Sequence, residues 1–464
     1  MPYIGNTPTT QSFTSGTDYF NGTGSATVFT LNRPVVSIND IQVVVNNVVQ
    51  APNSGYSISG NTLTFDAAPS AGTNNVYVRY LTTTTQVIAP STNSVSYASL
   101  TPDMQQDIGI SFKNRIINGD MRIDQRTNGA LATGGIGGIY NSVDRWQFHE
   151  ATDATVTLQR VSDAPAGFSN SVRFTVTTAD SSFAAGEYCF YRQAIEGFNV
   201  ADFSLGTANA QPITISFFVK SSLTGTFSGS LQNSAENRGY AFTYAISAAN
   251  TWERKTVTIP GDITGTWLTD NGIGLSLAFS LGLGSTYSST ANTWASSTTF
   301  GTVDSVRVVS TLNATFQLTG VQLEKGTTAT AFDNRAYGTE LHLCQRYYEQ
   351  QDIAATGTDR PFSVGGAYVS GGNVISQQCV FFKVLKRATP TVTFSAAATF
   401  SHHAPGAFRN NLTNITLNNA LVTGLQIVCT SGSGGGSPSA QGIFAILESS
   451  GAGGTASIGI SAEL

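Results

Sequence analysis

Short runs in which apolar and polar residues alternate cover most of the chain, and they predict β-strands. The clearest run is PITISFFVKSS, where Ile213, Ile215 and Phe217 share one face of a strand and Val219 continues that face. Turns rich in Gly, Ser and Asn separate the runs, and residues 113–335 show no helical period. Many short strands at regular spacing predict a two-sheet β-sandwich for this part of the chain. Its other predicted strands are Thr155–Arg160, Ser171–Val176, Cys189–Gln193, Thr256–Ile259, Gly274–Phe279 and Ser305–Val309.

The stretch FQLTGVQLEK (316–325) predicts one more strand, which closes this sandwich. Its apolar residues are spaced as on a buried face if the chain slips by one residue at Thr319-Gly320, as in a β-bulge. After a turn, residues 339–349 carry apolar side chains at helical spacing, with Cys344 on the apolar face. A closing strand followed by a short helix is expected where a chain leaves one domain and enters another.

The first 82 residues predict a small antiparallel β domain. Between Asp40 and Leu81, strand-like runs are separated by Asn-Asn, Ser-Gly and Ala-Gly turn signals. Asn46-Asn47 tolerates the left-handed backbone that a tight hairpin requires, so a hairpin is predicted there.

Residues 83–112 predict a linker that ends in a short helix. The triplet TPD at 101–103 supplies an N-cap, a proline for the first turn and an acidic residue that the helix dipole favours. Met104 and Ile108 lie four residues apart, which gives only a narrow apolar stripe that is marginal alone in water. This helix either forms a three-helix neck with two further copies of the chain or caps the neighbouring sandwich.

Residues 352–464 predict a second β-sandwich. Beyond Ser401, the only ionised side chains are those of Arg409, Glu448 and Glu463. A domain with so little charge suits either packing between subunits or contact with glycans. Its predicted strands are Val380–Lys386, Thr391–Ser395, Ile415–Leu417, Gly424–Cys429, Gly442–Leu447 and Ala456–Ala462.

Composition argues against several classes of protein. Only 11% of the 464 residues are charged, against about 25% in ordinary soluble domains, while 40% are hydrophobic, which is enough for packed cores. The net charge of −5, with no lysine before Lys113, argues against nucleic-acid binding. No apolar run reaches the ~18 residues of a membrane span, and the N-terminal residues lack the regions of a signal peptide. The cysteines Cys189, Cys344, Cys379 and Cys429 show no metal-ligand spacing, and we expect buried free thiols.

Two segments of the chain resemble a known class of proteins. FKNRIINGDMRIDQRTNGA (112–130) and GVQLEKGTTATAFDNR with YGTELHLCQRYYEQ (320–350) are similar to a recurrent module of tailed-bacteriophage tail fibres. The resemblance implies a carbohydrate-binding β-sandwich of the jelly-roll type between them. We expect a turn at 118–120 and a pairing of Glu324 with an arginine at 115 or 335. The residues that match the module, all expected to be structural, are Arg115, Asn118, Gly119, Asp120, Gln125, Glu324, Gly326, Phe332 and Arg335.

A second resemblance covers the N-terminal domain. The pattern V-x-V-N-N-x-x-Q at 43–50, followed by Tyr56 and by T-L-T-F at 62–65, is similar to the virion-attachment domain of podovirus-type tail fibres. The resemblance implies that residues 1–82 bind phage tail or adaptor proteins.

Enzymatic chemistry finds little support in the sequence. Cleavage of a glycan would need paired carboxylates at a defined separation. The central candidates Asp144, Glu150, Glu187, Glu196 and Asp304 are joined by no sequence signature. No catalytic residue is therefore predicted, and the chain is not expected to be an enzyme.

Sugar binding needs exposed aromatic side chains that can stack on the sugar, and the tryptophans are the first candidates. Trp267, in GTWLTDNG, and Trp294, in ANTWASS, lie in loop-like context and are candidates for glycan contact. Trp146 and Trp252 lie in strand-like context, which is more typical of core residues.

The last domain contributes three further candidates for glycan contact, His402, His403 and Arg409. On a three-fold axis, one histidine ring per chain could bind a shared metal ion, because adjacent residues of a strand point to opposite faces. Two exposed loop histidines are the simpler interpretation, so no metal and no cofactor are predicted.

The sequence thus predicts an all-β, elongated homotrimer that serves as a phage tail fibre and binds host surface polysaccharide or lipopolysaccharide. It would be made in the host cytoplasm and become part of the virion tail, without inserting into a membrane. A purely structural virion appendage or adaptor, or a glycan depolymerase, remain alternatives. The predicted layout is 1–82 virion-attachment domain, 83–112 linker and helical neck, 113–337 central jelly-roll-like sandwich, 338–351 helical connector and 352–464 C-terminal sandwich as the tip.

Overall fold

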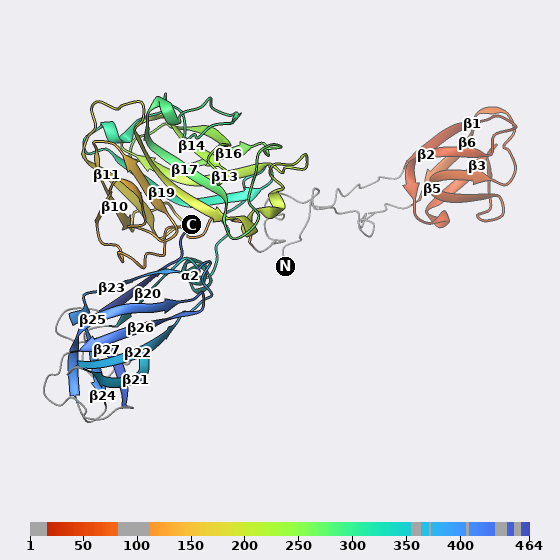
Figure 1. Ribbon diagram of the computed structural model, residues 1–464. Coiled ribbons are helices and arrows are strands. Elements are labelled where there is room, and N and C mark those ends of the chain that lie inside the picture. The colour runs from red at the N-terminus through yellow and green to blue at the C-terminus, as the bar shows by residue number, and fades with distance from the viewer. Residues whose placement is uncertain are drawn as a thin grey trace. The chain divides into compact units, whose positions relative to one another are not determined.

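The computed structural model describes residues 16–81, 112–353, 363–370, 373–404, 408–431, 443–449 and 456–464 (Figure 1). The chain divides into two compact units, Met1–Thr101 and Pro102–Leu464. Among the described residues, α2 (Tyr337–Gln345) is the one α-helix, and the all-β prediction is confirmed. None of the described helices is long and apolar enough to cross a membrane. The predicted linker and neck helix lie outside the described residues, apart from Phe112.

The described part of the first unit is a small antiparallel β domain. Its elements are β1 (Thr17–Gly22), β2 (Val28–Val35), the 3-10 helix η1 (Ile38–Asp40), β3 (Ile41–Val45), β4 (Val48–Val49), β5 (Tyr56–Phe65) and β6 (Gly72–Tyr80). One sheet has the order β1-β6-β3-β4, and β2 pairs with β5. The predicted Asn46-Asn47 hairpin is confirmed, because both residues have positive φ (46° and 63°) and Val45 pairs with Val48 across the turn.

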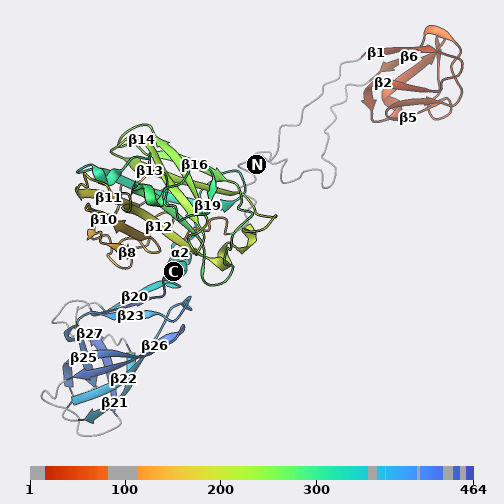
Figure 2. The same ribbon diagram turned by 45° about the horizontal axis from the view of Figure 1, so that its top comes forward.

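The second unit contains a sandwich of two antiparallel sheets (Figure 2). The six-stranded sheet consists, in spatial order, of β16 (Glu253–Ile259), β13 (Ile213–Ser221), β19 (Thr315–Lys325), β11 (Ser171–Thr178), β10 (Thr155–Val161) and β7 (Ala132–Thr133). The seven-stranded sheet consists of β18 (Trp294–Ala295), β15 (Gly239–Ile246), β14 (Gly225–Gln232), β17 (Ile273–Leu283), β12 (Tyr188–Glu196), β9 (Gln147–Ala151) and β8 (Gly137–Ile139). Its loops carry the 3-10 helices η3 (Gly197–Asn199), η4 (Ala201–Phe203), η5 (Ser285–Tyr287) and η6 (Val308–Ser310).

The core of the sandwich lies between the two sheets and follows the predicted alternation. Ile213, Ile215, Phe217 and Val219 of β13 are fully buried. On the neighbouring strand β19, the register shifts where two residues oppose one, and Gly320 at this bulge has a φ of +61°. The predicted slip at Thr319-Gly320 is therefore confirmed, and it keeps the apolar residues on both sides of the bulge in the core.

One predicted strand of the central domain was wrong. Residues 305–309 end in the 3-10 helix η6 instead of joining a sheet. Val308 and Val309 are both buried, which a turn inserted into the core permits and a strand buried on one face does not.

The helix after β19 is present but shorter than predicted. α2 ends at Gln345, and the predicted helical residues from Tyr348 onward belong to β20 (Tyr348–Ile353). β20 pairs along its whole length with β28 (Ala456–Ser461). This ladder joins residues about a hundred positions apart, so local periodicity could not reveal it. The hydrogen bonds with β28 fix these residues as a strand despite their helical spacing of apolar side chains.

The last domain is a closed barrel with a small sheet, where the sequence predicted a sandwich. The barrel order is β21 (Ser363–Ser370), β22 (Asn373–Phe381), β26 (Gly424–Ser431), β25 (Phe408–Ala420), β24 (Phe400–Ala404) and β27 (Ile443–Ser449), and β27 pairs again with β21. The small sheet has the order β20-β28-β23, with β23 at Thr391–Phe394, and η7 (Ala397–Thr399) precedes β24. Alternating strands look alike in both architectures, and only the pairing of β21 with β27 removes the sheet edges.

The cysteine prediction holds for three of the four thiols. Cys189, Cys344 and Cys429 are free and buried, whereas Cys379 is free and exposed. Along β22, burial alternates so that Ser376 and Gln378 point into the barrel and Cys379 points outward. The interior of this barrel is thus partly polar, which the preference of cysteine for cores could not anticipate.

Candidate binding pocket

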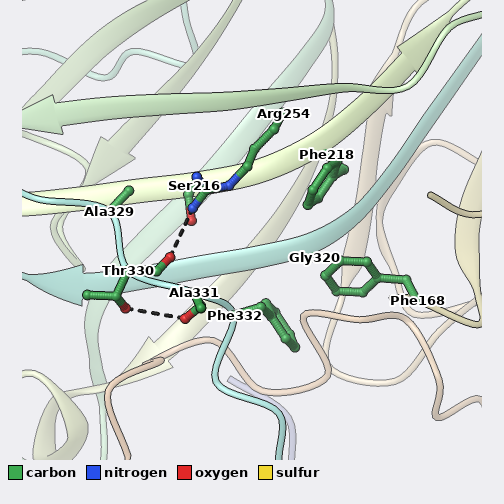
Figure 3. A pocket seen from close by; sticks show the side chains of 9 residues that line it. All are labelled: Phe168, Ser216, Phe218, Arg254, Gly320, Ala329, Thr330, Ala331 and Phe332. Atoms are coloured by element: carbon green, nitrogen blue, oxygen red, sulfur yellow. Dashed lines mark hydrogen bonds between the residues drawn. The ribbon is translucent and has the colours of Figure 1, made fainter. Parts of the chain in front are cut away.

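A pocket of about 390 Å³ lies on the outer face of the six-stranded sheet (Figure 3). On β13, Ser216 and Phe218 alternate with the fully buried core residues and therefore point away from the core. Arg254 of β16 stands directly opposite Phe218 in the ladder. Residues 329–332, which follow β19, and Phe168, between β10 and β11, complete the lining. The pocket thus combines strand positions with two loops that are far apart in the sequence.

Half-buried aromatic rings form one wall of the pocket. The ring centroid of Phe168 lies 5.3 Å from that of Phe218 and 5.0 Å from that of Phe332. A Cβ atom on Gly320 would lie 2.7 Å from Phe168 and 3.0 Å from Phe218. Glycine therefore serves twice at this position: it permits the positive φ of the bulge and leaves room for the rings above it.

A guanidinium group forms the polar side of the pocket. Nη2 of Arg254 donates a hydrogen bond to the carbonyl oxygen of Thr330 (2.9 Å), and the side chain is exposed. Within the described part of the chain, no ion pair involves Arg254, and none of the nine lining residues is acidic. The loop itself is fixed from below, because Glu324 accepts hydrogen bonds from the Thr330 amide (2.9 Å) and hydroxyl (2.7 Å).

The two segments that carry the phage-module resemblance meet at this loop. The Asn114 side chain donates to the Val321 carbonyl (3.0 Å) and accepts from the Leu323 amide (3.0 Å). The Asp333 amide donates to Oε1 of Gln322 (2.8 Å), which ties the loop to β19. These contacts hold β19 and its loop in place, and they serve structure rather than chemistry.

The predicted pairing of Glu324 with an arginine was wrong. Arg115 pairs with Asp202 (3.0 Å) and Arg335 pairs with Glu340 (3.2 Å). Glu324 is instead satisfied by Thr330 and by Gln322. The register of β19 explains why Glu324 has no arginine partner, since it directs this side chain toward the loop that contains Thr330. The predicted turn at 118–120 is present, with Asn118 at a φ of +57°.

The structure brings the two candidate tryptophans together. The rings of Trp267 and Trp294 contact each other edge to face at a centroid distance of 5.6 Å, and both pack against the sandwich core. Both indole N–H groups donate to backbone carbonyls, Trp267 to Thr264 (3.1 Å) and Trp294 to Pro260 (2.8 Å). The two tryptophans thus pack against the sandwich and neither lines the pocket, and their contact with glycans stays a prediction.

The remaining tryptophans follow the predicted core assignment only in part. Trp146 is fully buried and stacks on Tyr191 at 5.2 Å. Trp252 is half-exposed, however, and donates to Asp163 (3.3 Å) beside the ammonium of Lys220. Its strand context did not bury it because it lies just before the outer edge strand β16.

The candidates of the last domain lie in two paired strands of the barrel. His402 and His403 belong to β24, and Arg409 belongs to β25, where it stands opposite His403. No group of three or more His, Cys, Asp and Glu residues that could hold a metal ion occurs among the described residues.

Asp144 and Glu196, two of the five central carboxylates, make contacts within the fold. Asp144 is fully buried and accepts from Gln125, and burial raises its pKa to about 6 although Arg126 lowers it. Glu196 binds Arg346 (2.6 Å) and the Tyr347 hydroxyl (2.7 Å). Glu196 thus contacts the segment that follows the sandwich directly, and Asp144 binds Gln125, whose side-chain amide donates to the Tyr348 carbonyl (2.9 Å).

Glu150 provides a test of electrostatics inside the sandwich. Burial raises its pKa from 4.5 to about 7, and Thr152 donates its nearest hydrogen bond (3.1 Å). Because the folded state binds the proton more tightly, the stability that Glu150 contributes is full below pH 4.5 and is lost as the pH rises to about 7. Glu150→Gln should therefore raise the free energy of unfolding by about 1–2 kcal/mol at pH 8 and by little at pH 4.5.

Urea denaturation at the two pH values measures this difference. Asp304→Asn, which changes an exposed carboxylate, is the control and should have no comparable effect. An equal gain at both pH values for Glu150→Gln would contradict a titrating buried carboxyl.

Sequence inspection missed the pocket, although one signal for it was present. Phe218 follows Phe217 and breaks the alternation of β13 by placing a large ring on the polar face. A phenylalanine on the outward face of a strand that is otherwise polar on that side marks an unusual surface. Phe168, Arg254 and Phe332 give no such signal, because only tertiary contacts bring them to Phe218.

Comparisons with known proteins give no family for this chain. No protein-family model matches it. No curated protein is similar to it either.

Several solved structures are similar to part of the chain. The enzymatically active domain of bacteriophage CBA120 tailspike protein 4 matches 49% of this chain at 14% identity with a TM-score of 0.25, and the match spans only 22% of that protein's chain. The family 11 carbohydrate-binding module of the cellulosomal cellulase Lic26A-Cel5E of Clostridium thermocellum matches 42% of this chain and 99% of its own at 15% identity and a TM-score of 0.22. A putative sugar binding protein from Bacteroides thetaiotaomicron matches 46% and 99% at 12% identity and a TM-score of 0.25. At these TM-scores the similarities assign neither a ligand nor an activity to the chain.

Proposed function

We propose that the chain is a tail fibre or receptor-binding protein of a tailed bacteriophage and attaches the virion to glycans on the host surface. The resemblance of 112–130 and 320–350 to a phage fibre module motivates this assignment. The protein would be made in the host cytoplasm and work as part of the virion tail. Host polysaccharide or lipopolysaccharide would be its partner.

The observation that carries the binding proposal is the pocket on the central sandwich. Half-buried rings beside a polar, exposed guanidinium are the combination that a sugar needs, since its ring has apolar faces and a hydroxylated rim. The loop that closes the pocket is fixed by Glu324 and Asp333, so the site is preformed in the absence of ligand. Binding without cleavage fits the structural use of Asp144 and Glu196.

Attachment to the virion would use the N-terminal domain. Tyr19, Tyr77, Val44 and Val49 follow one another across the four strands of its larger sheet. The two end residues are exposed, Tyr19 to 61% and Val49 to 57%, whereas Tyr77 is half-buried and Val44 is buried. Uncharged side chains in a row across a sheet favour contact with another protein, and a phage tail or adaptor protein is the proposed partner.

A homotrimer would strengthen attachment to the host surface, because the weak contacts of three chains act together. A sugar pocket of this size supports only modest affinity, but several identical pockets that engage one surface multiply the strength of attachment. The proposed trimer rests on the resemblance to fibre proteins.

The binding proposal is tested with a panel of purified bacterial capsular polysaccharides and lipopolysaccharides, measured by biolayer interferometry. Phe218→Ala, which removes the central ring of the pocket, should weaken binding of the tightest ligand about tenfold or more. Phe198→Ala is the matched control, because Phe198 is 62% exposed on the same domain and lies outside the pocket. Absence of binding to every glycan, or an equal loss in both variants, would contradict the proposal.

A further inference from the structure

We propose that the pocket selects an acidic sugar, whose carboxylate pairs with Arg254 while the sugar ring lies against the phenylalanines. This inference rests on the proposed glycan binding and specifies the chemical class of the ligand. Uronic acids and sialic acids are the kinds of sugar residue that meet it.

The charge of the pocket is the first reason. Arg254 carries the only ionised side chain in the lining, and it is a cation. Nη2 of its guanidinium donates one hydrogen bond to the Thr330 carbonyl, and no carboxylate of the described residues pairs with it. Lys325, another exposed cation of this domain, is paired with Asp202 (2.9 Å), and the largely buried Lys220 is paired with Asp163. An exposed guanidinium with free donors at the mouth of a pocket is matched by a planar, bidentate anion such as a carboxylate.

The second reason is the position of the charge relative to the rings. Arg254 and Phe218 are direct partners across β16 and β13, so their side chains leave the sheet side by side. The Thr330 carbonyl, which Arg254 binds, belongs to the same loop that supplies Phe332. The guanidinium is therefore held at the Thr330 end of the pocket, and the phenylalanine rings lie toward the other end (Figure 3). An acidic sugar has its carboxylate attached directly to the ring, so ring stacking and ion pairing can occur together.

Glu324, the carboxylate that holds the pocket loop, does not compete for the guanidinium. Glu324 is 4% exposed and lies behind Thr330, and its oxygens accept from the Thr330 amide and hydroxyl and from Gln322. It is thus engaged on the side of the loop away from the pocket lining. Its hydrogen bonds also orient Thr330 so that the carbonyl oxygen meets Arg254.

The test compares acidic oligosaccharides with their neutral counterparts by isothermal titration calorimetry on the full-length chain. The probes are oligouronates and sialylated oligosaccharides, each also prepared with its carboxylates reduced to alcohols. Carboxyl reduction should weaken binding to the wild-type protein by about tenfold or more. Arg254→Gln, which keeps a hydrogen-bond donor but removes the charge, should lose this discrimination, so that the variant binds the acidic and the reduced form with about equal affinity.

Arg173→Gln is the matched control, because Arg173 lies on the outer face of β11 in the same sheet and outside the pocket lining. It should preserve the preference for the acidic form. Equal affinity of the wild type for acidic and reduced sugars would overturn the inference, and so would an equal loss for both sugars in Arg254→Gln. If neutral sugars bind and Phe218→Ala abolishes that binding, the proposed function stands and only the acidic preference fails. If no saccharide of either kind binds, both fail.

Discussion

Replacing Arg145 by alanine is expected to lower the free energy of unfolding of the second unit by about 3–5 kcal/mol. Arg145 is 1% exposed and forms an ion pair with Glu463, whose side chain is 6% exposed. Its Nη2 donates to the Ala194 carbonyl (2.6 Å), and its guanidinium lies 3.6 Å from the centre of the Tyr347 ring. Removing Arg145 would leave the buried negative charge of Glu463 with one cationic partner fewer and would create a cavity.

The electrostatic balance at this site explains why the loss is large. Burial is the largest influence on the pKa of Arg145 and lowers it. The Glu463 carboxylate acts together with Tyr347, Tyr140 and Cys344 in the opposite direction, and their sum raises that pKa above its ordinary value. Arg126 also contacts Glu463 (3.1 Å), so one carboxylate is shared by two arginines. The pair therefore connects the start of the sandwich domain with residues that follow the last strand.

Urea denaturation monitored by tryptophan fluorescence measures the change. Arg173→Ala, at a half-exposed arginine with a hydrogen bond to Gln159 (3.2 Å), is the control and should cost less than about 1 kcal/mol. A loss for Arg145→Ala no greater than that of the control would show that the buried pair contributes little.

Gly119→Ala is expected to destabilise the same unit by about 3 kcal/mol. A Cβ atom on Gly119 would overlap the carbonyl oxygen of Val321, and the Gly119 carbonyl itself accepts a hydrogen bond from the Val321 amide (2.9 Å). The added methyl group must push β19 away from the motif turn. Because β19 also supplies Gly320 and the loop of the pocket, ligand binding should weaken together with stability.

Gly338→Ala is the matched control for this substitution. Gly338 lies in α2, and a Cβ atom there would meet nothing within 4 Å. Alanine in a helix is favoured over glycine, so this variant should gain up to about 1 kcal/mol. Differential scanning calorimetry of the two variants measures both effects, and similar midpoints would contradict the close approach at Gly119.

Features that depend on near neighbours along the chain could be predicted from the sequence. Strand alternation identified the buried face of β13, and the slip in β19 could be placed at Thr319-Gly320 because only a bulge reconciles the apolar residues on its two sides. The Asn46-Asn47 hairpin followed from the backbone preference of asparagine. Each of these features spans a few residues, so the residues that cause it are neighbours in the sequence.

The pairing of segments that are distant in the sequence could be seen only in the folded chain. The closure of β21 on β27 makes a barrel from strands whose alternation would suit a sandwich equally well, and β28 draws Tyr348 out of a helical pattern into a ladder. The partner of Glu324 also depends on the folded chain: it binds Thr330 and not Arg115 or Arg335. Long-range pairing sets these outcomes because a side chain's partners depend on register and on the face to which it points.

The candidate site shows the same division most clearly. Trp267 and Trp294 were candidates in the sequence because exposed indole rings can stack on sugars. In the fold, their N–H groups donate to backbone carbonyls. The pocket is instead assembled from Phe168, Phe218 and Phe332 with Arg254, which approach one another only after β13, β16 and β19 align. Composition can show that such residues exist, but their convergence depends on sheet order and on a glycine bulge that leaves space for the rings.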